Sequence, residues 1–549
     1  MDEVEKLTRA AGVVSFFTLL SRILGLLRDM VVGYLFGAQA AADAFFVSFR
    51  IPNLLRRLTA EGALTAGFIP VFTDYLTNRG RDEAMGVARI VFTFATIFLA
   101  ALTLLGIVFA VPLTRLFAPG FLANPEKFTL TVYLTRLMFP YIFFVSLVAL
   151  AMGVLNSLRH FMAPALSPAL LNLSIIVCAL LLSPFLNQPV TSLAYGVLVG
   201  GIVQLLLQLP YLCRYGFSLS LDFRFGHPAL HRLLFLMGPA VFGAAVHQIN
   251  VLVSTILATM LPEGSVSYLY YADRLLEFPV GIFAIALGTA ALPSFSSLVA
   301  KREFAELRGA LSYALRLVNF ISLPATLGLM VVAVPVFSLF FQRGAFDAHT
   351  THNTAQALIY YSLGLWGISG TKVVVPVFYA MSDTKTPVWV GFWSFILNLL
   401  LGLALMGELS ASSDAGLLSR AIVTLSQYLA LFSLSHGALA LATSISSTFN
   451  FLVLLLILHR RLGEFPWSEF ITSFLRNLFN ALLMALPLLF IVGKVDWIGS
   501  ARDPLTYGAI FLMILALGLS LYLVLTFLWR SPEWQLVSQL GGRIKKALH

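Results

Sequence analysis

Seven basic residues lie inside stretches of this sequence that are otherwise apolar. Only five acidic residues share those stretches, so the set carries a cationic surplus. A surplus of this kind leaves room for an anion, and the planar guanidinium group of arginine binds phosphate through two parallel hydrogen bonds. The basic residues are Arg22, Arg28, Arg50, Arg56, Arg57, Arg274 and Lys372, and the acidic residues are Asp29, Asp43, Glu61, Asp273 and Glu277.

Helical geometry limits which arginines can act together. Arg22 and Arg28 are six residues apart and therefore point about 240° apart around a straight helix. Gly25 between them permits a bend or the close approach of a neighbouring helix. Arg56 and Arg57 differ by about 100°, so at most one of them can aim at the axis of a helical bundle. These angles exclude Arg50 and Arg57 from the core set.

Two structural explanations compete with anion binding. A single charge near the end of a span, such as Arg57, Glu61 or Lys372, often reaches the lipid headgroups. The arginines could also form ion pairs with Asp29, Asp43 or Asp273 that serve only the fold. The sequence leaves both explanations open.

The composition sets the environment of these charges. Of the 549 residues 59% are hydrophobic and 11% are charged, whereas soluble domains carry about 25% charged residues. The bilayer must be the main solvent, and the helix-length apolar runs indicate α-helices rather than a barrel. The net charge of +10 is explained by basic cytoplasmic loops, so no nucleic-acid partner is predicted.

A window of about 20 apolar residues predicts about fourteen spans. The alternation of basic and poorly charged loops predicts that both termini are cytoplasmic. Segment 408–436 is interpreted as an external loop with an interfacial helix, and an additional span is the alternative. The predicted spans are 12–34, 42–74, 87–113, 130–155, 162–185, 190–212, 233–260, 267–293, 312–340, 354–380, 388–407, 437–458, 470–493 and 506–528.

A weak internal repeat pairs distant parts of the sequence, for example Pro70 with Pro293. It predicts two lobes of about six helices each, as in transporters built from repeats. The predicted boundaries are 1–215 for the N-terminal lobe, 216–463 for the C-terminal lobe, and 464–549 for two additional helices and a cytoplasmic tail.

Other kinds of site lack a supporting pattern. Cys178 and Cys213 form no spacing motif, and His160 and His247 are isolated, so neither a disulfide nor a metal site is predicted. No phosphate-binding glycine loop, HExxH or GxSxG motif is present. We predict no catalytic residue and no cofactor.

Several motifs resemble those of one family of bacterial membrane transporters. They are SRILGLLRD at 21–29, DAFFVSFRIPNLLRRLTAEGAL at 43–64, APGF at 118–121, FPYI at 139–142, YYADRLLEFPVG at 270–281, ALPS at 291–294, TKV at 371–373 and FYAMSDTKTP at 378–387. On these motifs the chain resembles the MurJ (MviN) family of lipid II flippases, in the multidrug/oligosaccharidyl-lipid/polysaccharide exporter superfamily. The matching motifs end at Pro387, and the final third of the chain matches mainly by hydropathy.

The resemblance implies a fold and a site. The fold would be all-α and polytopic, with about fourteen transmembrane helices in two six-helix lobes in a V shape plus two C-terminal helices, placed in the bacterial inner membrane. The diphosphate of lipid II would be bound in a central cavity. The implied substrate ligands are Arg22, Arg28, Arg56 and Arg274, and the implied supporting or gating residues are Asp29, Asp43, Glu61, Asp273, Glu277 and Lys372.

The implied function is lipid II transport by alternating access in peptidoglycan biosynthesis, which supports the cell wall and cell shape. Membrane lipids and other cell-wall synthesis proteins are the further expected partners. The membrane potential, Na⁺ or H⁺ would supply the energy, and the sequence does not choose among them.

Four alternatives are weighed against this function. A drug antiporter should have an acidic or aromatic cavity, and a polysaccharide flippase is disfavoured only by the motifs. A membrane enzyme would need catalysts in a sizeable external loop, and the external loops are short. A scaffold gives no reason to hold arginines in the bilayer.

Overall fold

The computed structural model describes residues 3–56, 65–409, 416–529 and 531–534. Within these ranges every regular element is a helix and no strand is present, which confirms the predicted all-α fold. The chain divides into two compact units. The first comprises Met1–Ser267 with Leu409–Thr424, and the second comprises Tyr268–Glu408 with Leu425–His549.

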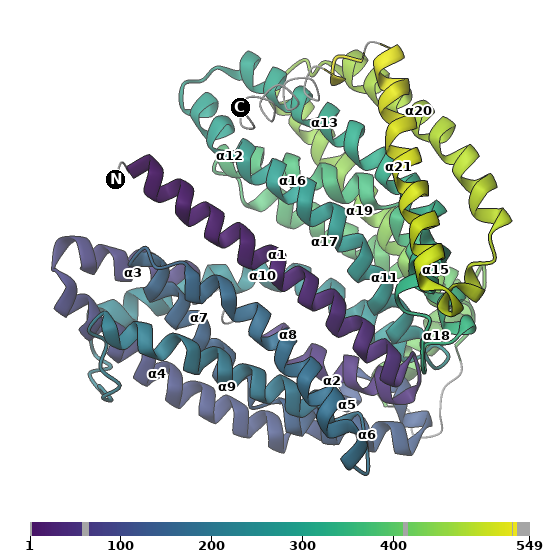
Figure 1. The fold of residues 1–549 in the computed structure, drawn as a ribbon. Coiled ribbons are helices and arrows are strands. Elements are labelled where there is room, and N and C mark those ends of the chain that lie inside the picture. Colours follow the sequence, from purple (N-terminus) through teal and green to yellow (C-terminus); the bar gives the residue numbers. More distant parts are fainter. Residues whose placement is uncertain (1–2, 57–64, 410–415, 530, 535–549) are drawn as a thin grey trace. The chain divides into compact units, whose positions relative to one another are not determined.

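The first unit contains α1 to α10 (Figure 1). Helix α8 packs along both α1 and α9, and α10 packs on α3. The elements are α1 (Glu3–Phe36), α2 (Ala40–Arg56), α3 (Thr65–Asn78), α4 (Arg81–Val108), α5 (Ala110–Phe117), the 3-10 turn η2 (Pro119–Ala123), α6 (Pro125–Met138), α7 (Tyr141–Ser157), α8 (Met162–Leu182), the 3-10 turn η3 (Ser183–Phe185), α9 (Thr191–Arg214) and α10 (Pro228–Thr259).

The second unit contains most of the remaining elements, and α20 and α21 lie side by side in it (Figure 1). The elements are α11 (Ser265–Pro279), the π-helical turn η4 (Val280–Ala284), α12 (Ile285–Ala300), α13 (Phe304–Val331), α14 (Ala333–Phe340), α15 (Ala348–Ser362), α16 (Leu365–Ala380), α17 (Lys385–Leu405), α18 (Leu417–Leu429), α19 (His436–Leu462), α20 (Trp467–Lys494), the 3-10 turn η5 (Trp497–Arg502) and α21 (Pro504–Leu528).

Within the described residues, ten helical segments are long and apolar enough to cross a bilayer. An eleventh exists if α15 and α16, which are bent by 43° at their junction, act as one span. The predicted spans 12–34, 42–74 and 233–260 correspond to α1, to α2 with α3, and to α10, which are outside the ten. Helix α1 carries Arg22, Arg28 and Asp29 in its apolar part. The total of about fourteen spans therefore stays a prediction.

The bounds of three helices in the first unit recur in the second unit at one constant offset in residue number. This repeat offset separates Arg81 from Phe304, the first residues of α4 and α13, and it also separates their last residues, Val108 and Val331. Helices α5 and α8 are related to α14 and α17 by the same offset at both ends. The weak repeat in the sequence is thus present in the backbone. The first repeat comprises α1 to α9, and the second comprises α10 to α19.

The loops before α8 and α17 repeat in the same way. Each contains a residue in the left-handed region, since Arg159 and Ser382, which are related by the repeat offset, have φ angles of 60° and 59°. In both loops the next amide donates to the carbonyl five residues earlier at 2.8 Å, which closes the preceding helix. The repeat therefore extends to the way these helices end.

Helix α18 lies in a connection that is much longer than the equivalent connection of the first repeat. Residues 183–190 join α8 to α9, whereas residues 406–435 join α17 to α19. The 13 residues of α18 span about 20 Å, which is short of the roughly 30 Å of a hydrocarbon core. The length favours the interfacial helix over an additional span, and its place outside the membrane stays a prediction.

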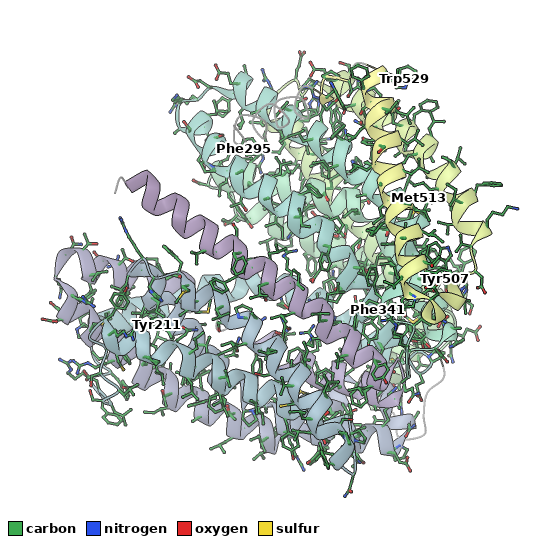
Figure 2. All side chains as sticks on the ribbon, viewed as in Figure 1. Tyr211, Phe295, Phe341, Tyr507, Met513 and Trp529 are labelled. Atoms are coloured by element: carbon green, nitrogen blue, oxygen red, sulfur yellow. The ribbon has the colours of Figure 1, made fainter. Side chains whose placement is uncertain are left out.

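Each unit has its own apolar core. In the first unit Phe68, Phe72 and Phe139 are central, and in the second a cluster around Phe295 and Phe378 joins α12, α13, α16 and α19. The apolar residues on the outer faces suit a lipid solvent. On α21, for example, Met513 is exposed, as is Trp529 directly after the end of the helix (Figure 2).

The domain boundaries that the sequence predicts stay a prediction. By its contacts α10 belongs to the first unit, although the predicted boundary at 215 assigns it to the second lobe. The repeat pairs α10 with α1, because their last residues, Phe36 and Thr259, are related by the repeat offset.

Candidate functional site

Arg28 is buried in the contact between α1 and α8, with 8% of its surface exposed. Its Nε and Nη2 atoms donate to Asp29 Oδ1 at 3.0 and 2.6 Å. Its Nη1 donates to the side-chain oxygen of Asn172 on α8 at 3.0 Å. A buried charge is tolerated only when it is paired and hydrogen-bonded, and these contacts meet that condition. The supporting role of Asp29 stays a prediction.

Arg22 lies on the same helix but in a different environment. Helix α1 is continuous from Glu3 to Phe36, so the predicted angular separation of Arg22 and Arg28 is retained. The side chain of Arg22 is half-buried, and it forms no hydrogen bond or ion pair within the described residues. The two arginines of α1 therefore differ, since one is held by protein groups and the other is not.

Helix α2 carries two further arginines. Arg56, at its last residue, is half-buried and donates from Nε to Asn53 Oδ1 at 2.8 Å. Arg50 donates to the hydroxyl of Thr255 on α10. The helix continues through Pro52. Of the other predicted residues in this region, Arg57 and Glu61 lie outside the described part of the chain.

Asp43 is a buried carboxylate with several hydrogen-bond donors, and 1% of its surface is exposed. Its Oδ2 accepts from Lys127 Nζ and from the Gly264 amide, both at 2.8 Å. Its Oδ1 accepts from the hydroxyl and the amide of Ser267 at 2.6 and 3.0 Å. Asp43 thus joins α2 to α6, to the turn before α11 and to the first turn of α11.

Sequence reasoning missed Lys127, which it placed in an external loop. The structure buries Lys127 beside Asp43, with its Nζ 4.2 Å from the ring centroid of Phe121. A local signal was present, because Asn124 and Pro125 are a capping residue and a first-turn proline. Asn124 accepts from the Lys127 amide, so α6 begins at Pro125, ahead of the predicted span at 130, and includes the lysine.

In the second unit, Arg274 is held by neighbours on its own helix, α11. Its Nη1 donates to Glu277 Oε2 at 2.9 Å. Its Nη2 and Nε donate to the hydroxyl of Tyr270 at 3.2 and 3.3 Å. The side chain of Arg274 is 34% exposed and that of Glu277 is 51% exposed. Asp273 is half-buried beside them.

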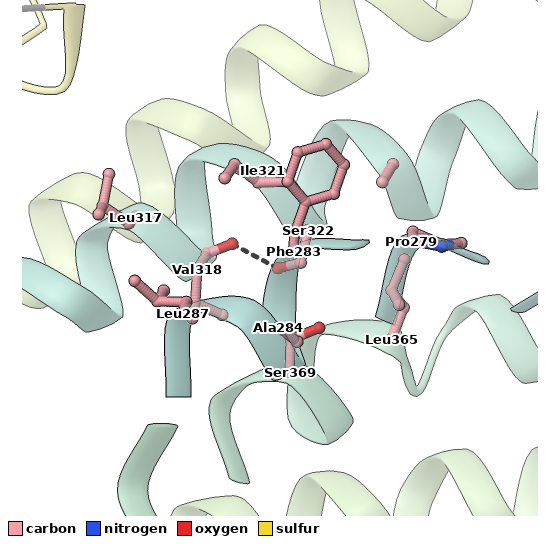
Figure 3. A pocket seen from close by; sticks show the side chains of 11 residues that line it. Pro279, Phe283, Ala284, Leu287, Leu317, Val318, Ile321, Ser322, Leu365 and Ser369 are labelled. Carbon is pink, nitrogen blue, oxygen red and sulfur yellow. Dashed lines mark hydrogen bonds between the residues drawn. The ribbon is translucent and has the colours of Figure 1, made fainter. Parts of the chain in front are cut away.

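The helix that carries Arg274 changes its winding just after that residue. Pro279 ends α11, and the π-helical turn η4 follows before α12. Short π-helical segments occur frequently at functional sites. A small, mainly apolar cavity of about 20 Å³ adjoins this turn and is lined by Pro279, Phe283 and Ala284, with Ser322 on α13 (Figure 3). The Ser322 hydroxyl is already bonded to the Val318 carbonyl at 2.6 Å.

Lys372 lies on α16 at a close crossing with α12. A Cβ atom on Gly288 would lie 2.2 Å from the carbonyl oxygen of Lys372, so only glycine fits there. The Lys372 side chain is exposed, and in the described part of the chain it forms no hydrogen bond or ion pair.

The structure separates Asp43 from the predicted arginines. Asp43 forms an ion pair with Lys127, so that bond does not neutralise the charge of any arginine. Among the predicted ligands and supporting residues of the first unit that the structure describes, Arg22, Arg28 and Arg56 then stand against Asp29, and Glu61 lies outside the described residues. Guanidinium groups in such a setting bind multivalent anions through charge-assisted hydrogen bonds.

A family model described as "Lipid II flippase MurJ" matches residues 32–501 of this chain. A lipid II flippase MurJ from Burkholderia cenocepacia is 36% identical over 520 residues, which cover 94% of this chain and 96% of that protein. A probable lipid II flippase MurJ from Vibrio cholerae is 39% identical over 440 residues, which cover 76% of this chain and 83% of that protein.

Solved structures show the same relationship. A structure of a lipid II flippase MurJ in an inward closed conformation has a TM-score of 0.75 at 25% identity, and the match covers 94% of this chain and 98% of that chain. An inward-facing multidrug resistance transporter of the MATE family has a TM-score of 0.65 at 14% identity, over 82% of this chain and 98% of that chain. At that identity the second match shows a shared fold alone.

Proposed function

Because the chain belongs to the MurJ family of lipid II flippases, we propose that it moves lipid II from the inner to the outer leaflet of the bacterial inner membrane by alternating access. Lipid II is the undecaprenyl-diphosphate-linked precursor of peptidoglycan. The resemblance drawn from the motifs is confirmed, and the chain is a multi-pass membrane transporter rather than an enzyme.

The headgroup of lipid II is the physical obstacle to this movement. It is a diphosphate that carries sugars and a peptide, and a bare ion costs tens of kcal/mol to transfer from water to hydrocarbon by a Born estimate. Guanidinium groups replace the lost hydration with charge-assisted hydrogen bonds, while the prenyl tail stays in lipid. The proposed diphosphate ligands are Arg22, Arg28 and Arg56 of the first unit and Arg274 of the second.

The contrast between the two arginines of α1 carries this proposal. Arg28 is an ionised group that the protein holds within its helix packing by means of Asp29. Arg22 has no protein partner in the described residues, so its charge is available to an anion. In the proposed sequence, the diphosphate binds Arg22 first and then displaces the Asp29 carboxylate from Arg28.

Release requires that the site weaken when it opens to the outer leaflet. We propose that Asp29 returns to Arg28 at that stage and that Glu277 competes in the same way at Arg274. Asp43 is proposed to control opening, because its bonds to Lys127, Gly264 and Ser267 must break if α2 moves away from α6 and the turn before α11. Asp273, Glu61 and Lys372 are proposed as supporting charges.

The energy source is proposed to be electrical or ionic. Moving one net charge across the membrane is worth about 2.3 kcal/mol per 100 mV, so a cycle that moves arginine charge with its cargo responds to the potential. Na⁺ or H⁺ coupling is the other proposed source.

We also propose that both termini lie on the cytoplasmic side and that α18 lies at the outer surface. Other cell-wall synthesis proteins are the proposed partners.

The test is lipid II translocation in proteoliposomes with single alanine variants of Arg22, Arg28, Arg56 and Arg274. Arg460→Ala, an exposed arginine at the end of α19, is the matched control. We expect the four variants to lose most translocation at normal expression and the control to retain it. Full activity in Arg28→Ala and Arg274→Ala would exclude the diphosphate site, and complementation of a lipid II flippase depletion strain tests the cargo itself.

A further inference from the structure

Asn172 makes two contacts with α1 from its place on α8. Its side-chain nitrogen donates to the Ser21 carbonyl at 3.1 Å, and its side-chain oxygen accepts from Arg28 Nη1 at 3.0 Å. The two contacts have opposite polarity, so they fix which end of the amide faces which partner. Only 8% of Asn172 is exposed.

Gly25 leaves the space that this amide occupies. Ser21, Gly25 and Arg28 are four and three residues apart, so they share one face of α1. A Cβ atom on Gly25 would lie 3.5 Å from the side-chain nitrogen of Asn172, an ordinary contact distance. Alanine therefore fits at position 25, whereas a longer side chain would have to enter the volume of the amide.

The neutrality of asparagine matters for the charge of the site. Asp29 already supplies one negative charge to Arg28. An amide oxygen orients the guanidinium group without adding a second charge, so the arginine keeps its attraction for an incoming anion. A carboxylate at the same position would offer Arg28 a competing partner that cannot diffuse away.

We infer that Asn172 is a positioning residue for anion binding, which holds the Arg28 guanidinium group in place when the diphosphate displaces Asp29. This inference rests on the proposed function. Its physical basis is that a side chain anchored at both ends keeps a bidentate donor oriented and lowers the cost of ordering it on binding.

The test measures binding of farnesyl diphosphate to the full-length protein in nanodiscs. A hydrogen bond to a charged group typically changes affinity by about tenfold or more, so we expect Asn172→Ala to raise the dissociation constant by about tenfold. Asn172→Asp should raise it further, because the added carboxylate competes for Arg28. Gly25→Ala should bind normally, and Gly25→Leu should behave like Asn172→Ala.

Asn319 provides a matched control for a merely structural role. It is a fully buried asparagine on α13 that also bridges two partners, since it accepts from Trp366 Nε1 at 2.8 Å and donates to the Phe470 carbonyl at 3.4 Å. Asn319→Ala should lower the thermal midpoint and leave the dissociation constant unchanged. The dissociation constants of Asn172→Ala and of the unmodified protein are compared at equal folded fraction.

A double-mutant cycle separates this inference from the proposed function. If Asn172 acts through Arg28, the double variant Arg28→Ala/Asn172→Ala binds no more weakly than Arg28→Ala alone. Independent, additive losses would overturn the positioning role, as would normal binding by Asn172→Asp. If Arg28→Ala itself binds normally, the diphosphate site is wrong as a whole, which is a different result from failure of Asn172 alone.

Discussion

The two repeats share a backbone plan but place several of their charges at different positions. In the first repeat, Arg22, Arg28 and Asp29 lie on α1, and the equivalent positions on α10 are Ala245, Val251 and Leu252. In the second repeat, Arg274 lies on α11, and its counterpart on α2 is Ile51. The shared plan therefore supplies the scaffold, and the charges that break the repeat mark the residues with a specific task.

The way each arginine is held also differs. Arg28 is buried and depends on Asn172 from another helix, whereas Arg274 is half-exposed and depends on Tyr270 and Glu277 of its own helix. Removing a partner should therefore have unequal consequences in the two units. The packing of α1 on α8 brings Asn172 to Arg28, and one turn of α11 brings Tyr270 and Glu277 to Arg274.

The largest expected effect follows from the removal of the Asp29 carboxylate. Asp29→Ala removes a charge partner that is 4% exposed from an arginine that is 10% exposed. An uncompensated buried charge costs about 3–5 kcal/mol, so folded yield and the thermal midpoint should fall sharply. Glu277→Ala, at the exposed pair, should cost at most about 1 kcal/mol. Thermal unfolding in detergent measures both, and equal losses would contradict the distinction.

Lys127 extends the comparison to the other buried pair. Its counterpart in the second repeat is Thr350, a buried neutral residue. Lys127→Thr leaves the buried Asp43 carboxylate with its bonds to Ser267 and Gly264 but without its cation, so we expect thermal unfolding to show a loss of about 3 kcal/mol. Adding Asp43→Asn should recover part of it. A double variant less stable than Lys127→Thr would show that the ion pair is not the cause.

Gly288 tests the crossing on which the second unit relies. Gly288→Ala places a Cβ atom against the Lys372 carbonyl and must push α12 from α16, at a cost of roughly 1–3 kcal/mol for overpacking. Because the π-helical turn adjoins this crossing, translocation should fall more than stability does. Gly328→Ala on α13, where a Cβ meets nothing within 4 Å, is the control. If both variants translocated equally well, the crossing of α12 and α16 would have no role in translocation.

The smallest expected effect concerns the loops that follow the two repeats, residues 215–227 after α9 and 463–466 after α19. The first loop is longer and folds onto α4, where the Asp222 amide donates to the Thr93 hydroxyl at 2.9 Å. A hydrogen bond from the Arg224 guanidinium group lowers the pKa of Asp222 from 3.8 to about 2. A lowered pKa gives stability that is present above about pH 4 and is lost as the pH falls toward 2.

We therefore expect hydrogen exchange in residues 215–227 to increase over that acid range. Asp222→Asn should show faster exchange at neutral pH and no further acid dependence in this loop. Asp383→Asn, a change in a loop of the second unit, is the control and should leave the acid response of residues 215–227 as it is. An unchanged acid response in Asp222→Asn would assign the effect to another group.

Local pattern was sufficient for much of this description. The all-α fold, the angular separation of Arg22 and Arg28 and the space beside Gly25 follow from composition and helical period. The repeat of Pro70 in Pro293 is visible in the sequence itself. Some bounds were missed for local reasons. The span predicted at 354–380 is divided between α15 and α16, because a bend leaves the hydropathy of a stretch unchanged. The span predicted at 42–74 includes residues 57–64, which lie outside the described part of the chain.

Partners at long range could not be read from the chain. Nothing in the sequence joins Arg28 to Asn172, 144 residues away, or Asp43 to Lys127, 84 residues away. Such pairs depend on which helix faces pack together, and that choice is made by the whole set of contacts rather than by any one segment. The sequence alone showed that arginines lie within apolar, helix-length stretches of this flippase. The tertiary structure decided which of them are held by protein groups, because a buried charge persists only where the packing brings it a partner.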